Sequence, residues 1–150
     1  MLGRFRRLLP GLWAGVLLGV ALLATPAPFA LLAQADAGRV VARLLSHEAT
    51  TSLALGVLLL GLERLATRHT TSAGLASQFS VGMLLCLGAL FCTVAGYFAL
   101  QPLMAAARAG QGHLSFGQLH ALSAAFYIVK TALVLALAWR AARPPAEPQA

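Results

Sequence analysis

The stretch FGQLHALSAAFYIVKTALVLALAW, residues 116–139, decides the fold, because it is long enough to cross a bilayer and contains one formally charged residue, Lys130. A membrane-spanning helix needs roughly 20 predominantly apolar residues. At about 100° per residue, its polar side chains fall within one arc of about 80°; they are His120, Ser123, Tyr127 and Lys130. The stretch therefore predicts a transmembrane helix whose polar stripe faces the interior of a helical bundle.

Further apolar stretches of similar length precede it, and the composition is typical of a membrane protein. Hydrophobic residues make up 59% of the 150 residues, charged residues only 10%, and the mean hydropathy is +0.81. A soluble domain carries about 25% charged residues. We therefore expect an all-α integral membrane four-helix bundle in one domain, residues 1–143, with a disordered Pro-rich tail, 144–150. The expected helices span residues about 8–32, 49–65, 79–100 and 119–139.

Positive charges gather on one side of the expected spans, and cytoplasmic loops collect Lys and Arg. Seven arginines fall on one side, Arg4, Arg6, Arg7, Arg64, Arg68, Arg140 and Arg143, and three on the other, Arg39, Arg43 and Arg108. This bias predicts that both termini are cytoplasmic. The net charge of +7 lies at the edges of apolar runs and is not interleaved with aromatic residues. It therefore indicates orientation in the lipid bilayer and not nucleic-acid binding.

The first apolar run allows two interpretations. Ala33-Gln34-Ala35 has the small-x-small spacing of a signal-peptidase site, and cleavage there would leave a three-span protein that begins at Asp36. However, the run from Leu8 to Ala33 is longer than the apolar region of a signal peptide, about 7 to 15 residues. It also contains a GxxxGxxxG pattern, typical of a face that packs on a partner helix; its residues are Gly11, Gly15 and Gly19. We therefore expect a retained first helix.

Prolines are expected to end two of the helices. A proline removes a backbone donor and disfavours helical conformation at the residue before it. Pro26 and Pro28 should therefore end the first helix, and Gln101-Pro102 should end the third.

Lys130 also allows two interpretations. Its side chain could extend along the helix so that the ammonium group reaches the cytoplasmic headgroups. Alternatively, it is paired inside the bundle as part of a polar path or binding site, and the expected partner is then Glu63, which lies near the inner end of the second helix.

A second group of polar residues is expected at the outer leaflet. Ser46 should cap the second helix, which places His47 and Glu48 at its outer end, near His120. Asp36 and His113 could approach from the loops. Histidines and carboxylates together can bind zinc, copper or iron, but no HxxxH or HxxE pair fixes two ligands on one helix face. His47, Glu48 and His120 are therefore weak metal candidates, and no cofactor is predicted.

With these residues assembled, the chain resembles the transmembrane protein 205-like family, which carries a domain of unknown function (DUF4149), and more distantly bacterial copper-resistance D membrane proteins. The matching stretches are LWAGVLLGVALLATPAPFALL (12–32), AGRVVARLL (37–45) and FGQLHALSAAFYIV (116–129). The signature residues are Trp13, Gly15, Pro28, Phe29, Gly38, Arg39, Phe116, His120 and Ser123. The resemblance implies a four-helix protein of the bacterial inner membrane and no established activity.

Two functional hypotheses follow. The first is a small membrane subunit or accessory protein that is not an enzyme, because the chain has no HExxH, P-loop, GxGxxG or spaced nucleophile and base. The alternative is a transporter or a metal- or haem-handling protein that uses the His47, Glu48 and His120 cluster. The sequence leaves the ligand, the oligomeric state and the pathway open.

Overall fold

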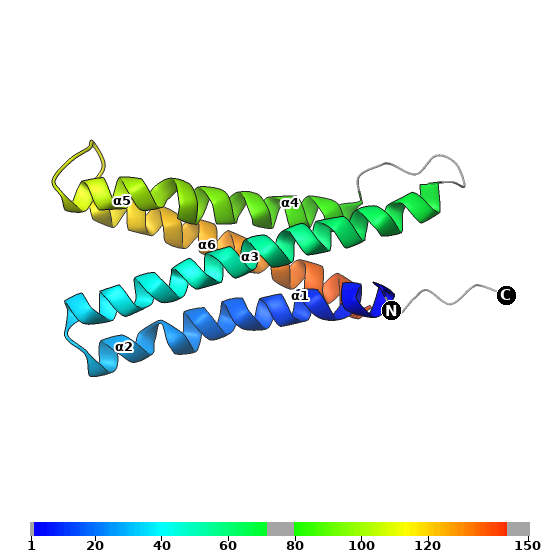
Figure 1. Cartoon of the computed structure of the whole chain (residues 1–150), viewed down its shortest axis with the longest axis horizontal. Helices are drawn as coiled ribbons and strands as arrows, with labels where there is room; N and C mark the ends of the chain where they lie inside the picture. The colour runs from blue at the N-terminus through cyan, green and yellow to red at the C-terminus, as the bar shows by residue number, and fades with distance from the viewer. Residues whose placement is uncertain (1, 72–79, 144–150) are drawn as a thin grey trace.

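The computed structural model describes residues 2–71 and 80–143 as an antiparallel bundle of helices (Figure 1). Four segments are long and apolar enough to cross a membrane: Gly3–Leu31, Gln34–Ala66, Val81–Arg108 and Phe116–Ala142. The predicted all-α four-helix membrane architecture is confirmed. The predicted tail, 144–150, and the predicted start of the third helix at Phe79 lie outside the described residues.

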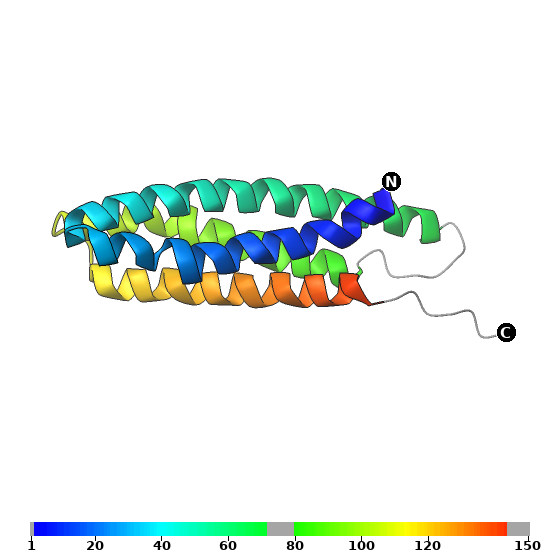
Figure 2. The ribbon, with the colours of Figure 1, turned by 90° about the horizontal axis from the view of Figure 1, so that it is seen from below.

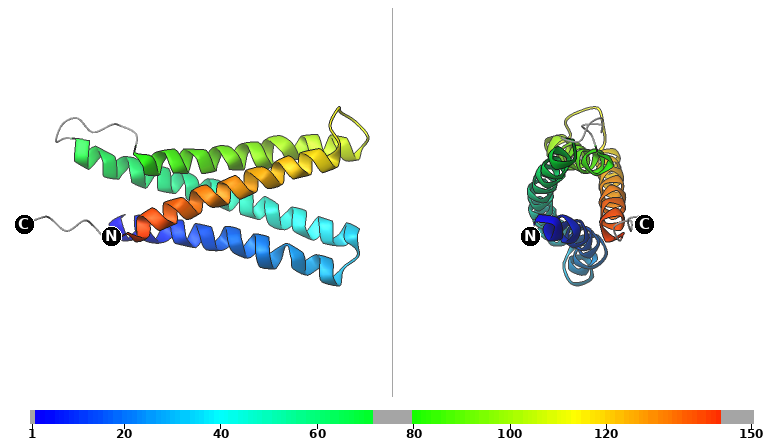
Figure 3. Two further views of the ribbon diagram at one scale, coloured as in Figure 1. Left: turned by 180° about the vertical axis from the view of Figure 1, so that it is seen from behind. Right: turned by 90° about the vertical axis from the view of Figure 1, so that its right-hand side faces the viewer.

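The elements are α1 (Leu2–Gly19), η1 (Val20–Ala24), α2 (Pro26–Leu31), α3 (Gln34–Thr71), α4 (Val81–Thr93), η2 (Val94–Ala99), α5 (Leu100–Arg108) and α6 (Phe116–Ala142), of which η1 and η2 are π-helical. They lie nearly parallel to the long axis of the bundle (Figure 2). α1 packs against α3 and α6, and α4 packs against the same two helices. Seen along the long axis, the order around the bundle is therefore α1, α3, α4, α6 (Figure 3). α1 begins and α6 ends at the same end, which we call the terminal end; the opposite end is the turn end (Figure 1).

The first span does not end at its prolines, so this prediction was wrong. The π-helical turn η1 comes directly before Pro26, and the Thr25 backbone N–H donates to the Val20 carbonyl at 2.9 Å. Pro26 then occupies the first position of α2, where no helical N–H bond is needed. The wider π-helical turn accommodates Pro26, which has no backbone N–H to donate and whose ring would clash with the preceding turn of an α-helix. The span continues to Leu31.

The third span repeats this arrangement, and the prediction that Gln101-Pro102 ends it was also wrong. The π-helical segment η2 precedes α5, and Pro102 lies in the first turn of α5. Helix α5 continues to Arg108. The α5–α6 connection contains two residues with positive φ, Gly110 and Gly112, a conformation that only glycine adopts at no steric cost.

α3 begins at Gln34 instead of near Ala49, so Ser46 does not cap it. The Ser46 carbonyl accepts a hydrogen bond from Thr50 Oγ1 at 3.0 Å, which is an ordinary contact inside a helix. His47 and Glu48 therefore lie well inside the second span. α6 does begin with a cap, because the Ser115 hydroxyl accepts from the Gln118 backbone N–H and the Gln118 side chain accepts from the Ser115 backbone N–H.

The core is centred on α1. Trp13 and Leu17 are fully buried and pack with Leu59, Cys86 and Val134. Helices approach most closely at glycines of the other spans, since a Cβ added at Gly56, Gly82 or Gly96 would lie 2.4 to 2.6 Å from a neighbouring side chain. By contrast, a Cβ at Gly11, Gly15 or Gly19 would meet nothing within 4 Å. The glycine face of α1 therefore makes no close approach to another described residue, and a partner helix on it stays a prediction.

Candidate functional site: a buried ion pair

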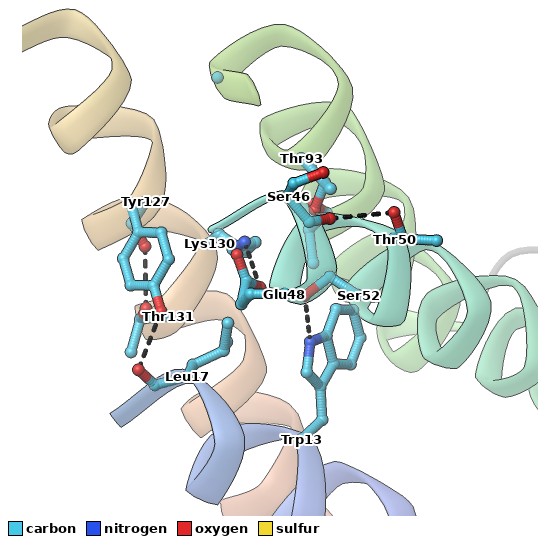
Figure 4. Close-up of polar contacts among 12 residues, drawn as sticks. Trp13, Leu17, Ser46, Glu48, Thr50, Ser52, Thr93, Tyr127, Lys130 and Thr131 are labelled. Atoms are coloured by element: carbon cyan, nitrogen blue, oxygen red, sulfur yellow. Dashed lines mark hydrogen bonds and ion pairs between the residues drawn. The ribbon is translucent and has the colours of Figure 1, made fainter. Parts of the chain in front are cut away.

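An ion pair joins α3 and α6 in the middle of the bundle (Figure 4). Lys130 Nζ donates to Glu48 Oε1 at 2.8 Å, and the two side chains are only 4% and 3% exposed. The predicted partner, Glu63, was wrong: it accepts a hydrogen bond from Arg6 at the terminal end. Lys130 is thus paired inside the bundle and does not reach the headgroups.

The ion pair belongs to a chain of hydrogen bonds that reaches α1. Glu48 Oε1 also accepts from Ser52 Oγ at 2.5 Å, and Ser52 Oγ in turn accepts from Trp13 Nε1 at 2.9 Å. All four side chains are buried. The chain Trp13, Ser52, Glu48, Lys130 therefore connects α1, α3 and α6 through side-chain atoms alone (Figure 4).

The rest of the polar stripe of α6 bonds to other helices. The Tyr127 hydroxyl donates to the Leu17 carbonyl at 2.9 Å, and the Tyr127 ring lies 4.6 Å from Lys130 Nζ. The Ser123 hydroxyl donates to the Gly96 carbonyl at 2.6 Å. His120 differs, because it is exposed and stacks on Phe116 with 5.7 Å between ring centroids.

The ion pair lies near the middle of the span. Trp139 is 70% exposed nine residues after Lys130, and His120 is exposed ten residues before it. At 1.5 Å per residue, both lie about 15 Å from Lys130 along α6, which is half the thickness of a bilayer core. An exposed Trp at this depth is typical of a membrane interface. Glu48 therefore lies near the middle of the second span, and its predicted position at the end of that helix was wrong.

The buried polar groups of this network have partners within the chain. Among the described residues, every buried side-chain nitrogen and oxygen has a hydrogen-bond partner. An unpaired charge at this depth is costly, so the loss of either partner of the ion pair would destabilise the bundle. The side-chain hydrogen bonds of the network connect α1, α3 and α6, which is a structural role.

The metal candidates do not come together. His47 is exposed while Glu48 is buried, and His120 lies about 15 Å nearer to the turn end. Asp36 pairs with Arg39 in the first turn of α3, and His113 is exposed in the α5–α6 loop. Within residues 2–71 and 80–143, no group of three His, Cys, Asp or Glu side chains could hold a metal ion. The transporter or metal-handling alternative is not favoured.

α3 also carries polar residues on its outer side, within about 8 Å of Glu48 along the helix. We call Arg43, His47, Thr50 and Thr51 the polar face of α3; all are exposed and lie within the span. His47 and Glu48 are adjacent in sequence, yet one faces outward and the other inward, because successive helix residues point about 100° apart.

Sequence reasoning missed Trp13 and Ser52 as members of the network. Ser52 follows Glu48 by four residues, a spacing that places both on one helix face, so this signal was available. The Trp13 contact joins residues 39 positions apart, and nothing in the sequence indicates which serine a tryptophan N–H reaches.

The sequence profile of a protein family, described as a domain of unknown function (DUF4149), matches residues 8–113. The chain belongs to this family. No curated protein and no solved structure matches the chain. The stretch FGQLHALSAAFYIV lies beyond the matched residues, and likeness to transmembrane protein 205 or to copper-resistance D proteins stays a prediction.

Proposed function

We propose that this chain is a small, non-enzymatic subunit or accessory protein of a bacterial inner-membrane assembly, and that it binds another membrane protein through the polar face of α3. The observation that carries the proposal is the exposure of Arg43 and His47 within a membrane span. Polar side chains that face lipid are costly. A neighbouring helix with complementary polar groups would remove this cost.

The charge of this face defines the partner. Arg43 and His47 make no side-chain hydrogen bond or ion pair with any other residue in the described part of the chain. A carboxylate on a facing helix would neutralise Arg43 and accept charge-assisted hydrogen bonds from its guanidinium. A second copy, related by a two-fold axis along the membrane normal, would place Arg43 against Arg43 at one depth. The partner is therefore a different membrane protein with an Asp or Glu in a transmembrane helix.

The same proposal places both termini in the cytoplasm. The arginine bias supports this orientation, and the structure brings the start of α1 and the end of α6 to one end (Figure 1). The polar face of α3 then lies between the middle of the membrane and its periplasmic side.

A photocross-linking amino acid introduced at Thr50 tests the proposal in native membranes. Ile128 provides the matched control, because it is 69% exposed on α6 and lies close in depth to the ion pair. We expect an adduct with one other protein from position 50 and none from position 128. Mass spectrometry should place the cross-link in a transmembrane helix that contains Asp or Glu.

Charge substitutions then test the chemistry. Arg43→Glu should reduce the adduct about 10-fold or more, the effect of losing a hydrogen bond between charged groups, and Arg43→Lys should retain it. Reversal of the partner's carboxylate to Lys should restore the adduct of the Arg43→Glu variant. A cross-link to lipid or to a second copy only, or one insensitive to Arg43→Glu, would contradict the proposal.

A further inference from the structure

A hollow of about 340 Å³ opens between the start of α1, the start of α4 and the end of α6. We call it the arginine hollow, because the charged residues that line it in the described part of the chain are four arginines and one carboxylate, namely Arg6, Arg7, Arg140, Arg143 and Glu63. It lies at the terminal end of the bundle, away from the polar face of α3. Nothing in the buried ion-pair network lines it.

The single carboxylate of the arginine hollow is already engaged. Glu63 accepts from Arg6 at 2.5 Å and from the Ser80 hydroxyl at 3.4 Å. The guanidinium groups of Arg7, Arg140 and Arg143 form no hydrogen bond or ion pair with any described residue. Three arginines without an ion-pair partner among the described residues therefore line one concave space. Guanidinium groups bind phosphate oxygens in a planar, two-pronged geometry.

An apolar groove adjoins the arginine hollow on the lipid-facing side of the α1–α6 contact. Its volume is about 500 Å³, and Arg7 lines both spaces. Leu8, Leu12, Leu135 and Trp139 supply the apolar walls, and Gly11 lies between them. Because a Cβ at Gly11 would meet nothing within 4 Å, this glycine leaves the floor of the groove open.

The two spaces together match a molecule with an anionic head and an apolar chain. Exposed Trp139 places them at the depth of the membrane interface, where phospholipid headgroups lie. Basic pockets between transmembrane helices on the cytoplasmic side are a recognised form of anionic headgroup site. A free phosphate ion could occupy the arginine hollow but would leave the apolar groove unused.

We propose that the terminal end binds an anionic phospholipid, with its phosphate in the arginine hollow and one acyl chain in the groove beside Gly11. The site is independent of the polar face of α3, so it goes beyond the proposed function. Arg7 is the residue that lies between headgroup and chain, and Arg140 and Arg143 close the headgroup side.

The test measures binding to the delipidated, detergent-purified chain by native mass spectrometry. Its probes are dioleoylphosphatidylglycerol, dioleoylphosphatidylcholine and inorganic phosphate. We expect phosphatidylglycerol to bind at least about 10-fold more tightly than phosphatidylcholine. Each arginine near the membrane surface contributes about 5-fold, so the Arg140→Gln/Arg143→Gln variant should bind phosphatidylglycerol about 30-fold more weakly.

Arg4→Gln/Arg64→Gln is the matched control, because both arginines are exposed at the same end and neither lines the arginine hollow. This variant should retain wild-type binding. Gly11→Leu should fill the groove and weaken phosphatidylglycerol binding without changing the helical circular dichroism of the protein. Equal losses of phosphatidylglycerol binding in the two double-arginine variants would indicate that binding depends on diffuse surface charge. This result would overturn the proposed site. Displacement of the lipid by millimolar inorganic phosphate, together with indifference to Gly11→Leu, would assign a free-anion site and overturn the lipid proposal.

Discussion

Replacement of Glu48 by glutamine tests how much the buried ion pair contributes to stability. The new amide would keep an acceptor for the Ser52 hydroxyl but would leave the Lys130 ammonium, whose side chain is 4% exposed, without a counter-charge near the middle of the membrane. Removal of one partner from a buried pair typically costs about 3–5 kcal/mol. We expect Glu48→Gln and Lys130→Met each to lower the free energy of unfolding by this amount.

The double variant Glu48→Gln/Lys130→Met should recover most of the loss. A buried pair replaced by uncharged groups of similar size is often close to neutral, since the desolvation penalty of both charges disappears with their attraction. The free energy of unfolding, measured by titration with sodium dodecyl sulfate in mixed micelles, should therefore lie within about 2 kcal/mol of wild type. The coupling energy of the cycle would then exceed the roughly 0.5 kcal/mol within which independent sites add.

Glu63→Gln is the matched control, with the same chemical change 15 residues along the same helix. Its partner Arg6 has a side chain that is 47% exposed, so the guanidinium can return to water when the carboxylate is lost. We expect a cost of about 1 kcal/mol or less. Additive losses in the double variant, or a larger effect from Glu63→Gln than from Glu48→Gln, would refute the assignment of Glu48 as the partner of Lys130.

Further variants examine the packing of the helices and the first span. Gly96→Ala should lower the free energy of unfolding by about 1–3 kcal/mol, because its Cβ would lie 2.4 Å from a facing phenylalanine, whereas Gly11→Ala should be neutral. Trp13→Phe should lose about 1 kcal/mol, since the bond from its indole N–H to Ser52 disappears. Intact-mass measurement of the membrane-extracted protein should find residues 1–35 present, and a mature chain that begins at Asp36 would refute retention of the first helix.

Hydropathy predicted the number of spans because it reports which residues can face lipid, but it could not predict where the helices end. The first part of α3 contains Asp36, Arg39, Arg43 and His47 and is nevertheless helical. Charged residues lower hydropathy without breaking backbone hydrogen bonds, so an apolar window placed the start of this helix about 15 residues too late. At Pro26 the end of a helix was predicted too early, because a π-helical turn accommodates a proline in a way that no local residue pattern indicates.

The error at the start of α3 also produced the wrong partner for Lys130. Depth along a helix was estimated from a predicted start near Ala49, which placed Glu48 at the surface. The second span in fact covers Gln34–Ala66, so its middle lies near Thr50. Glu48 then matches the depth of Lys130, and Glu63 lies about 22 Å farther along α3 toward the terminal end. The stripe on α6 was predictable because it depends only on helical periodicity, whereas the pairing depends on the register between two helices.

The buried pair and the polar face of α3 are geometrically linked. His47 and Glu48 are neighbours on one rigid helix, so the bond that holds Glu48 toward Lys130 also fixes the direction in which His47 and Arg43 point. Apolar contacts alone would define the rotation of α3 less strictly, since apolar cores tolerate alternative packing when volume is kept. An ion pair in the middle of the bundle permits one rotation of α3 about its axis and one position along it. Any other arrangement leaves a charge unpaired in a medium without water. In this chain the pair sets the orientation of the surface that we propose binds a partner, which is a role separate from its contribution to stability.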